Sequence, residues 1–81
     1  MTQRTWKVAP RQMTVACDAA MALTAAREAL DATVSRLHRA GLTEAALETD
    51  RIRDAMSALS VGLDMEARNC FVRLRRGEET A

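Results

Sequence analysis

Two long helical patterns meet at a single break, Gly41-Leu42-Thr43, and this arrangement limits the possible folds more than any other feature of the chain. The first pattern covers about residues 10–40 and the second about residues 44–76. Gly41 suits the left-handed position after a helix, Leu42 the apolar position that follows it, and Thr43 the N-cap of the next helix. The sequence therefore predicts an all-α fold, a long antiparallel helical hairpin with helices of about 45–50 Å.

The two ends of the hairpin are predicted from proline and glycine. Ala9 precedes Pro10 and is biased away from helix, so residues 1–9 are expected to form an extended N-terminal arm. Pro10 suits a first helical turn. Gly77 stops the second helix, which leaves residues 77–81 as a flexible tail.

Each helix carries two apolar stripes side by side. On the first helix, one stripe contains Met13, Ala16, Ala20, Leu23, Leu30, Val34 and Leu37, and the other contains Val15, Ala19, Ala22, Ala26, Ala29 and Thr33. On the second helix, one stripe contains Ile52, Met56, Leu59, Leu63, Cys70 and Leu74, and the other contains Leu47, Ala58, Val61, Met65 and Val72. A hairpin buries one stripe of each helix, and the remaining stripes need a neighbour.

A second copy of the chain is the economical neighbour, since two hairpins form a two-fold symmetric four-helix bundle. The row of alanines favours a close approach of helices in that bundle. The residues expected in the core or the dimer contact are Leu23, Leu30, Val34, Leu37, Ala22, Ala26, Ile52, Met56, Leu59, Leu63 and Met65.

Composition supports assembly and excludes several classes. A chain of 81 residues, in which apolar residues are 48% and the only aromatics are Trp6 and Phe71, builds a marginal core by itself. No run approaches the ~18–20 apolar residues of a membrane span. With two cysteines and no disulfide framework, a cytoplasmic protein with reduced thiols is expected.

No constellation for catalysis, cofactor or metal binding is recognised. Cys17, His38 and Cys70 are too far apart for a zinc site, and Cys70 is expected to be a buried apolar residue. Most acids are spaced for helix-surface pairs: Arg27 with Asp31, Asp50 with Arg53, and Asp64 with Arg68. Arg27 and Glu66 interrupt the apolar stripes, where each is expected to reach the rim or to set register in the dimer.

Charge is uneven although the formal net charge is only +1. Residues 1–16 carry three bases and no acid, residues 17–66 carry nine acids against five bases, and residues 67–81 carry four arginines against two glutamates. Folding back at Gly41 brings both basic segments to the open end of the hairpin. That end is expected to meet an acidic protein surface or nucleic acid, or to stay solvated.

Trp6 lies on the arm between Arg4 and Lys7, outside both helices, and Trp and Arg are enriched at binding hot spots. The residues expected to bind a partner are Trp6, Arg4, Lys7, Arg11, Phe71, Arg73, Arg75 and Arg76. A purely structural role is equally consistent with the sequence: Trp6 folds back beside Phe71 and caps the open end.

These patterns favour a small non-enzymatic homodimer that acts as an adaptor or inhibitor by occluding or scaffolding a partner protein. In general form the chain is similar to small helical-hairpin adaptors and inhibitors, including those with which phages or bacteria occupy a surface of another protein. The alternative is a nucleic-acid-binding or transcription-regulating hairpin that uses the basic open end, although no recognised DNA- or RNA-binding signature accompanies it.

Overall fold

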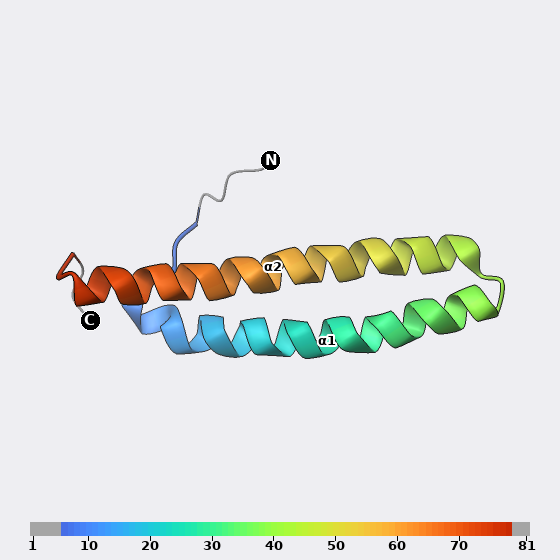
Figure 1. Cartoon of the computed structure of the whole chain (residues 1–81), viewed down its shortest axis with the longest axis horizontal. Helices are drawn as coiled ribbons and strands as arrows, with labels where there is room; N and C mark the ends of the chain where they lie inside the picture. Colours follow the sequence, from blue (N-terminus) through green and yellow to red (C-terminus); the bar gives the residue numbers. More distant parts are fainter. Residues whose placement is uncertain (1–5, 79–81) are drawn as a thin grey trace.

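Two antiparallel helices lie side by side in the computed structural model, which describes residues 6–78 and confirms the all-α hairpin (Figure 1). One turn of 3-10 helix, η1 (Pro10–Gln12), leads into α1 (Met13–Arg39), and a short turn connects α1 to α2 (Thr43–Arg75). The molecule measures 55 × 24 × 13 Å, so it is a single layer one helix thick. The arm runs from the start of α1 across to α2 at the open end (Figure 1).

Both helices end in the same glycine-dependent way. Gly41 has φ +79°, its N–H donates to the His38 carbonyl at 3.0 Å, and the Leu42 N–H donates to the Leu37 carbonyl at 2.9 Å. These are the two hydrogen bonds of a Schellman ending, as the sequence predicts. Gly77, with φ +75°, ends α2 in the same manner.

The start of each helix differs from expectation. Leu42, and not Thr43, is the N-cap residue of α2, without a side-chain capping hydrogen bond. Because Leu42 belongs to the Schellman ending and its carbonyl accepts the Ala46 N–H at 3.0 Å, α2 begins immediately and Thr43 falls inside its first turn. At the other end, Pro10–Gln12 form a separate 3-10 turn, so α1 begins at Met13.

Small side chains make the closest contact between the helices. The buried residues of α1 and α2 are Ala16, Ala20, Val34, Ala46, Ser60, Gly62, Ala67 and Cys70. Larger residues beside them are only half-buried: Met13, Leu23, Leu30, Leu37, Met56, Leu63 and Leu74. Small residues let the helices approach closely, and two helices alone leave little interior for larger ones.

The predicted main stripe of α2 is divided in the structure. Met56, Leu63, Cys70 and Leu74 face α1, whereas Ile52 and Leu59 are 56% and 48% exposed. At those two levels the residues that turn towards α1 are Arg53 and Ser60, one position later along the helix. Since one residue is a rotation of about 100°, Ile52 and Leu59 lie on an edge of α2. A hairpin core that includes them is therefore wrong, and their contact with a second copy stays a prediction.

Three other residues expected in the core or the dimer contact are not fully buried by the hairpin. Ala22 and Met65 are exposed and Ala26 is half-buried. Within residues 6–78, neither helix has a stretch long and apolar enough to cross a membrane.

Candidate interaction surfaces

The N-terminal arm is anchored on the open end of the hairpin by Val8. This side chain is 4% exposed and packs with Ala16, Ala67 and Cys70. The Arg73 Nη2 donates to the Val8 carbonyl at 3.2 Å. The Gln12 side chain accepts the Ala9 N–H at 2.9 Å, which fixes the bend from the arm into η1. Val8 thus anchors the arm in the core at the open end of the hairpin.

A groove of about 440 Å³, here called the arm groove, separates the arm from the start of α1. Its lining consists of Trp6, Lys7, Val8, Arg11, Gln12, Val15, Ala16, Ala19 and Leu63. Apolar side chains predominate, and both charged lining residues are basic. Neither Lys7 nor Arg11 has an ion-pair partner within residues 6–78.

The structure gathers only part of the predicted partner-binding set in this groove. Trp6, Lys7 and Arg11 line it together, with Trp6 38% exposed. Phe71, Arg73, Arg75 and Arg76 do not line it. Arg4 lies outside the described residues.

The arginines of the α2 C-terminus have contacts of their own. The Arg75 guanidinium lies 5.9 Å from the centroid of the exposed Phe71 ring, an arrangement typical of a cation–π contact. Arg76 lies 3.9 Å from a Glu78 carboxylate oxygen, and Arg68 pairs with Asp64 at 3.0 Å as predicted. With Arg73 bound to the Val8 carbonyl, this end offers fewer unpaired cations than the sequence suggests.

One side of the hairpin, here called the alanine side, is an uncovered apolar surface. On α1 it contains Val15, Ala19, Ala22, Ala26 and Ala29, and on α2 it contains Ile52, Ala55 and Leu59. The members on each helix follow 3-4 spacing and so share a face. Val15, Ile52 and Leu59 are 69%, 56% and 48% exposed. The arm groove adjoins this surface through Val15 and Ala19.

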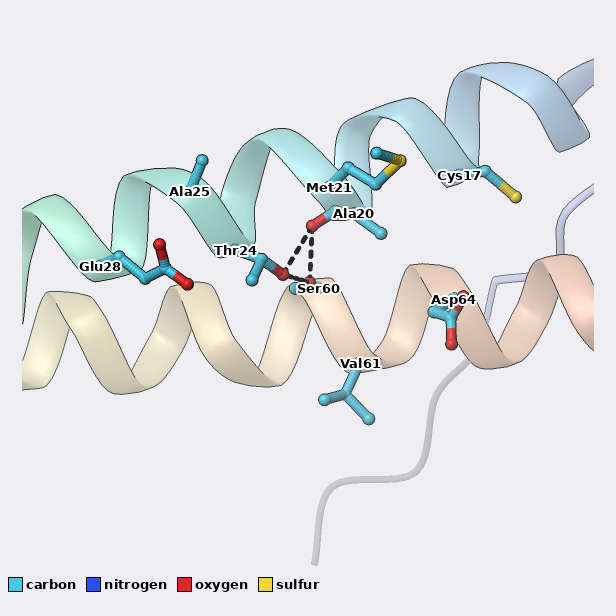
Figure 2. Close-up of a pocket in the computed structure, with 9 residues that line it drawn as sticks. All are labelled: Cys17, Ala20, Met21, Thr24, Ala25, Glu28, Ser60, Val61 and Asp64. Atoms are coloured by element: carbon cyan, nitrogen blue, oxygen red, sulfur yellow. Dashed lines mark hydrogen bonds between the residues drawn. The ribbon is translucent and has the colours of Figure 1, made fainter.

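The opposite side, here called the polar side, contains Cys17, Thr24, Glu28, Asp31, Arg53, Ser57, Ser60 and Asp64, together with the exposed apolar residues Met21 and Val61. Figure 2 shows its central part, a shallow pocket of about 560 Å³. The Thr24 and Ser60 hydroxyls lie 2.9 Å apart, and each donates to the Ala20 carbonyl, at 2.9 and 2.8 Å. Cys17 and Asp64 lie at one end of the pocket and Glu28 at the other (Figure 2).

The polar groups that line this pocket are two hydroxyls, the Cys17 thiol and the carboxylates of Glu28 and Asp64. Both hydroxyls share the Ala20 carbonyl as acceptor, and no histidine or lysine lines the pocket. The Cys17 side chain is exposed and that of Cys70 is buried. Within residues 6–78, no three His, Cys, Asp or Glu side chains are arranged to hold a metal ion, and His38 lies exposed near the turn.

Ion pairs on the polar side connect the two helices. Arg53 pairs with Asp31 at 2.8 Å and also with Asp50. The hydrogen bond to Asp31 and the nearby Asp50 carboxylate raise the pKa of the Arg53 guanidinium. The predicted pair of Asp50 with Arg53 is confirmed, but the predicted pair of Arg27 with Asp31 is wrong, because Asp31 reaches across to α2 instead of along α1.

Arg27 occupies a core-facing position without a carboxylate partner among the described residues. Its Nη1 lies 3.4 Å from the Ser57 hydroxyl, and its buried Nε has no hydrogen-bond partner. Sequence reasoning missed the Thr24–Ser60 contact and the anchoring of Val8. The signal for Val8 was a single β-branched apolar residue two positions before Pro10.

Comparison with models of protein families, with curated proteins and with solved structures found no match to this chain.

Proposed function

We propose that this chain is a non-enzymatic protein-protein interaction module of the cytoplasm, which dimerises into a four-helix bundle and acts as an adaptor or inhibitor. The observation that carries the proposal is the alanine side. Ile52 and Leu59 are about half exposed beside a face of α1 that consists of alanine and valine. An apolar surface of this kind on so thin a hairpin indicates a site of protein contact.

The contrast with the polar side supports a second hairpin as the covering partner. Apolar residues recur at 3-4 spacing along both helices of the alanine side, and this spacing is the one that packs helices near 20° in four-helix bundles. The alanines at positions 22, 26 and 29 of α1 leave room for the larger Ile52 and Leu59 side chains of a facing copy, whereas Val15 and Ala19 belong to the arm groove. Stacking two layers would give each chain the interior that a single layer lacks.

The open end is then the surface that would capture a partner protein, by occlusion or scaffolding. Trp6 has a large ring held near two cations by an anchored arm. Tryptophan and arginine dominate hot spots when they are grouped in this manner. A protein partner is favoured over nucleic acid, because the four arginines from Arg68 to Arg76 already contact a carboxylate, a carbonyl or an aromatic ring.

Two measurements on the full chain test this proposal. Light scattering at micromolar concentration should give twice the 8.9 kDa chain mass, and a stable monomer at that concentration would contradict the dimer. Trp6→Ala should keep that mass and helicity while weakening capture of a protein partner by about 1–2 kcal/mol or more. Leu42→Ala, an exposed apolar change at the turn, is the matched control and should leave capture unchanged.

Nucleic-acid binding is the competing outcome. Phosphate contacts release counterions, so binding through the basic end would fall steeply with salt. Sub-micromolar, salt-sensitive binding of DNA or RNA that survives Trp6→Ala would replace the interaction module with the nucleic-acid-binding hairpin.

A further inference from the structure

We infer that the arm groove binds a protein segment that carries both carboxylates and large aliphatic side chains. The inference rests on the proposed function and specifies the chemistry of its partner. The groove lies between the arm, the start of α1 and Leu63 of α2, which is far from both in sequence. It exists only because Val8 holds the arm on the hairpin.

The floor of the groove selects aliphatic groups. Val8, Val15, Ala16, Ala19 and Leu63 line it, and Trp6 forms a wall at the arm. Its volume of about 440 Å³ is large enough for side chains of a peptide. A leucine or isoleucine of a partner would replace water against these surfaces.

The charges at the groove select carboxylates. Lys7 and Arg11 are exposed, no acidic residue lines the groove, and neither cation is paired within residues 6–78. An approaching anion would therefore displace no internal ion pair. Complementary charge of this kind sets specificity and association rate.

The groove is preformed, which reduces the entropy cost of binding. Val8 is 4% exposed, Arg73 holds its carbonyl, and Gln12 fixes the bend at Ala9. A segment that binds here would not have to order the arm from residue 6 onward.

A protein segment fits these features better than single-stranded nucleic acid. Nucleic-acid platforms stack successive bases on several aromatic rings along a cationic track. Here Trp6 is the one aromatic residue of the lining, and the remaining floor is aliphatic.

The test uses the full chain and a short fluorescent peptide that alternates glutamate with leucine. Trp6 is the only tryptophan of the chain, so its emission reports directly on the groove while peptide anisotropy reports binding. Binding should shift the emission, and it should be lost with peptides in which glutamine replaces glutamate or serine replaces leucine. Lys7→Glu combined with Arg11→Glu should weaken binding about tenfold or more, since two attractive contacts become repulsive.

Arg39→Glu makes the same kind of charge change at an exposed site near the turn and should leave binding unchanged. Circular dichroism checks that the Lys7 and Arg11 variants keep the hairpin. Absence of peptide binding, or binding that the double variant does not weaken, would overturn the inference. Tighter binding of a single-stranded oligonucleotide at the same site would do so as well.

Light scattering of the same samples separates this inference from the proposed function. If the protein is a dimer that does not bind the peptide, the assignment of the groove is wrong and the proposed interaction module stands. If the protein is a monomer that binds the peptide through Lys7 and Arg11, the proposed dimer is wrong and the assignment of the groove stands. If the Lys7 and Arg11 changes dissociate the dimer, the groove contacts a second copy of the chain. The inference that it binds a segment of another protein would then be overturned.

Discussion

The two sides of the hairpin differ in how far the side chains on them find contacts within one chain. On the polar side, the Thr24 and Ser60 hydroxyls and the Asp31–Arg53 pair join α1 to α2. On the alanine side, Ile52 and Leu59 contact water over about half of their surface. The polar side is joined by polar contacts within one chain, and the alanine side resembles an interior that lacks its second layer.

This difference arises from single-residue offsets along the helices. Ile52 and Arg53 are neighbours in sequence, as are Leu59 and Ser60, yet a rotation of about 100° places them at different edges of α2. The hairpin brings the small or polar member of each pair towards α1. The large apolar member remains available for a partner.

The largest expected effect is that of a charge on the alanine side. Leu59→Glu would place an unpaired carboxylate in the proposed dimer contact and should weaken dimerisation by about 3–5 kcal/mol. Met21→Glu, at an exposed apolar residue that lines the pocket of the polar side, should leave the dimer intact. Sedimentation equilibrium measures the mass of both variants. Equal masses would contradict the claim that only the alanine side forms the dimer contact.

A size change tests how closely the second layer packs. Ala22 is exposed in the single chain, and leucine is nearly as good a helix former as alanine. If a second helix approaches here, Ala22→Leu should destabilise the dimer by about 1–3 kcal/mol. Ala25→Leu, on the same helix beside the polar pocket, is the matched control. Unchanged thermal unfolding for both would mean that Ala22 is a surface residue.

On the polar side the expected effects are smaller and independent of dimerisation. Ser60→Ala removes a buried hydroxyl that bonds Thr24 and the Ala20 carbonyl, and should cost about 0.5–1.5 kcal/mol in urea unfolding. Ser35→Ala, at an exposed serine of α1, should cost less than this. A shift of Ser60→Ala towards monomer would show that the polar side also faces a partner.

The smallest effect is expected at the ion pairs. Asp31→Asn removes one partner of Arg53, but Asp50 remains, and the pair is exposed. The loss in unfolding free energy should stay within about 0.2–1 kcal/mol and shrink as salt is added. A larger, salt-independent loss would mean that the polar side is more tightly coupled than its exposure indicates.

The sequence predicts the hairpin well because its determinants are local. Gly41 and Leu42 specify the turn, and alanine-rich helices need no distant contact to be recognised. The face that each helix turns inward is not local. The choice between Leu59 and Ser60 depends on how closely α1 approaches, which the small residues Ala16, Ala20 and Ala67 decide together.

The arm could be predicted only in part for the same reason. Pro10 predicts an extended segment before it, but docking of Val8 between α1 and α2 depends on contacts across the whole chain length, including Arg73. Sequence reasoning therefore identified Trp6, Lys7 and Arg11 as candidates without foreseeing the groove they share.

The most direct test of the second layer compares thiol reactivity on the two sides. The native Cys17 reports on the polar side, and Ala22→Cys in a Cys17→Ser background reports on the alanine side, with Cys70 buried in both proteins. As protein concentration rises through the dimerisation range, modification of the thiol introduced at position 22 should slow by about tenfold or more, because the second chain covers this thiol in a growing fraction of the molecules. Modification of Cys17 should keep one rate throughout. Equal, concentration-independent rates for both thiols, or protection of Cys17 alone, would contradict the account.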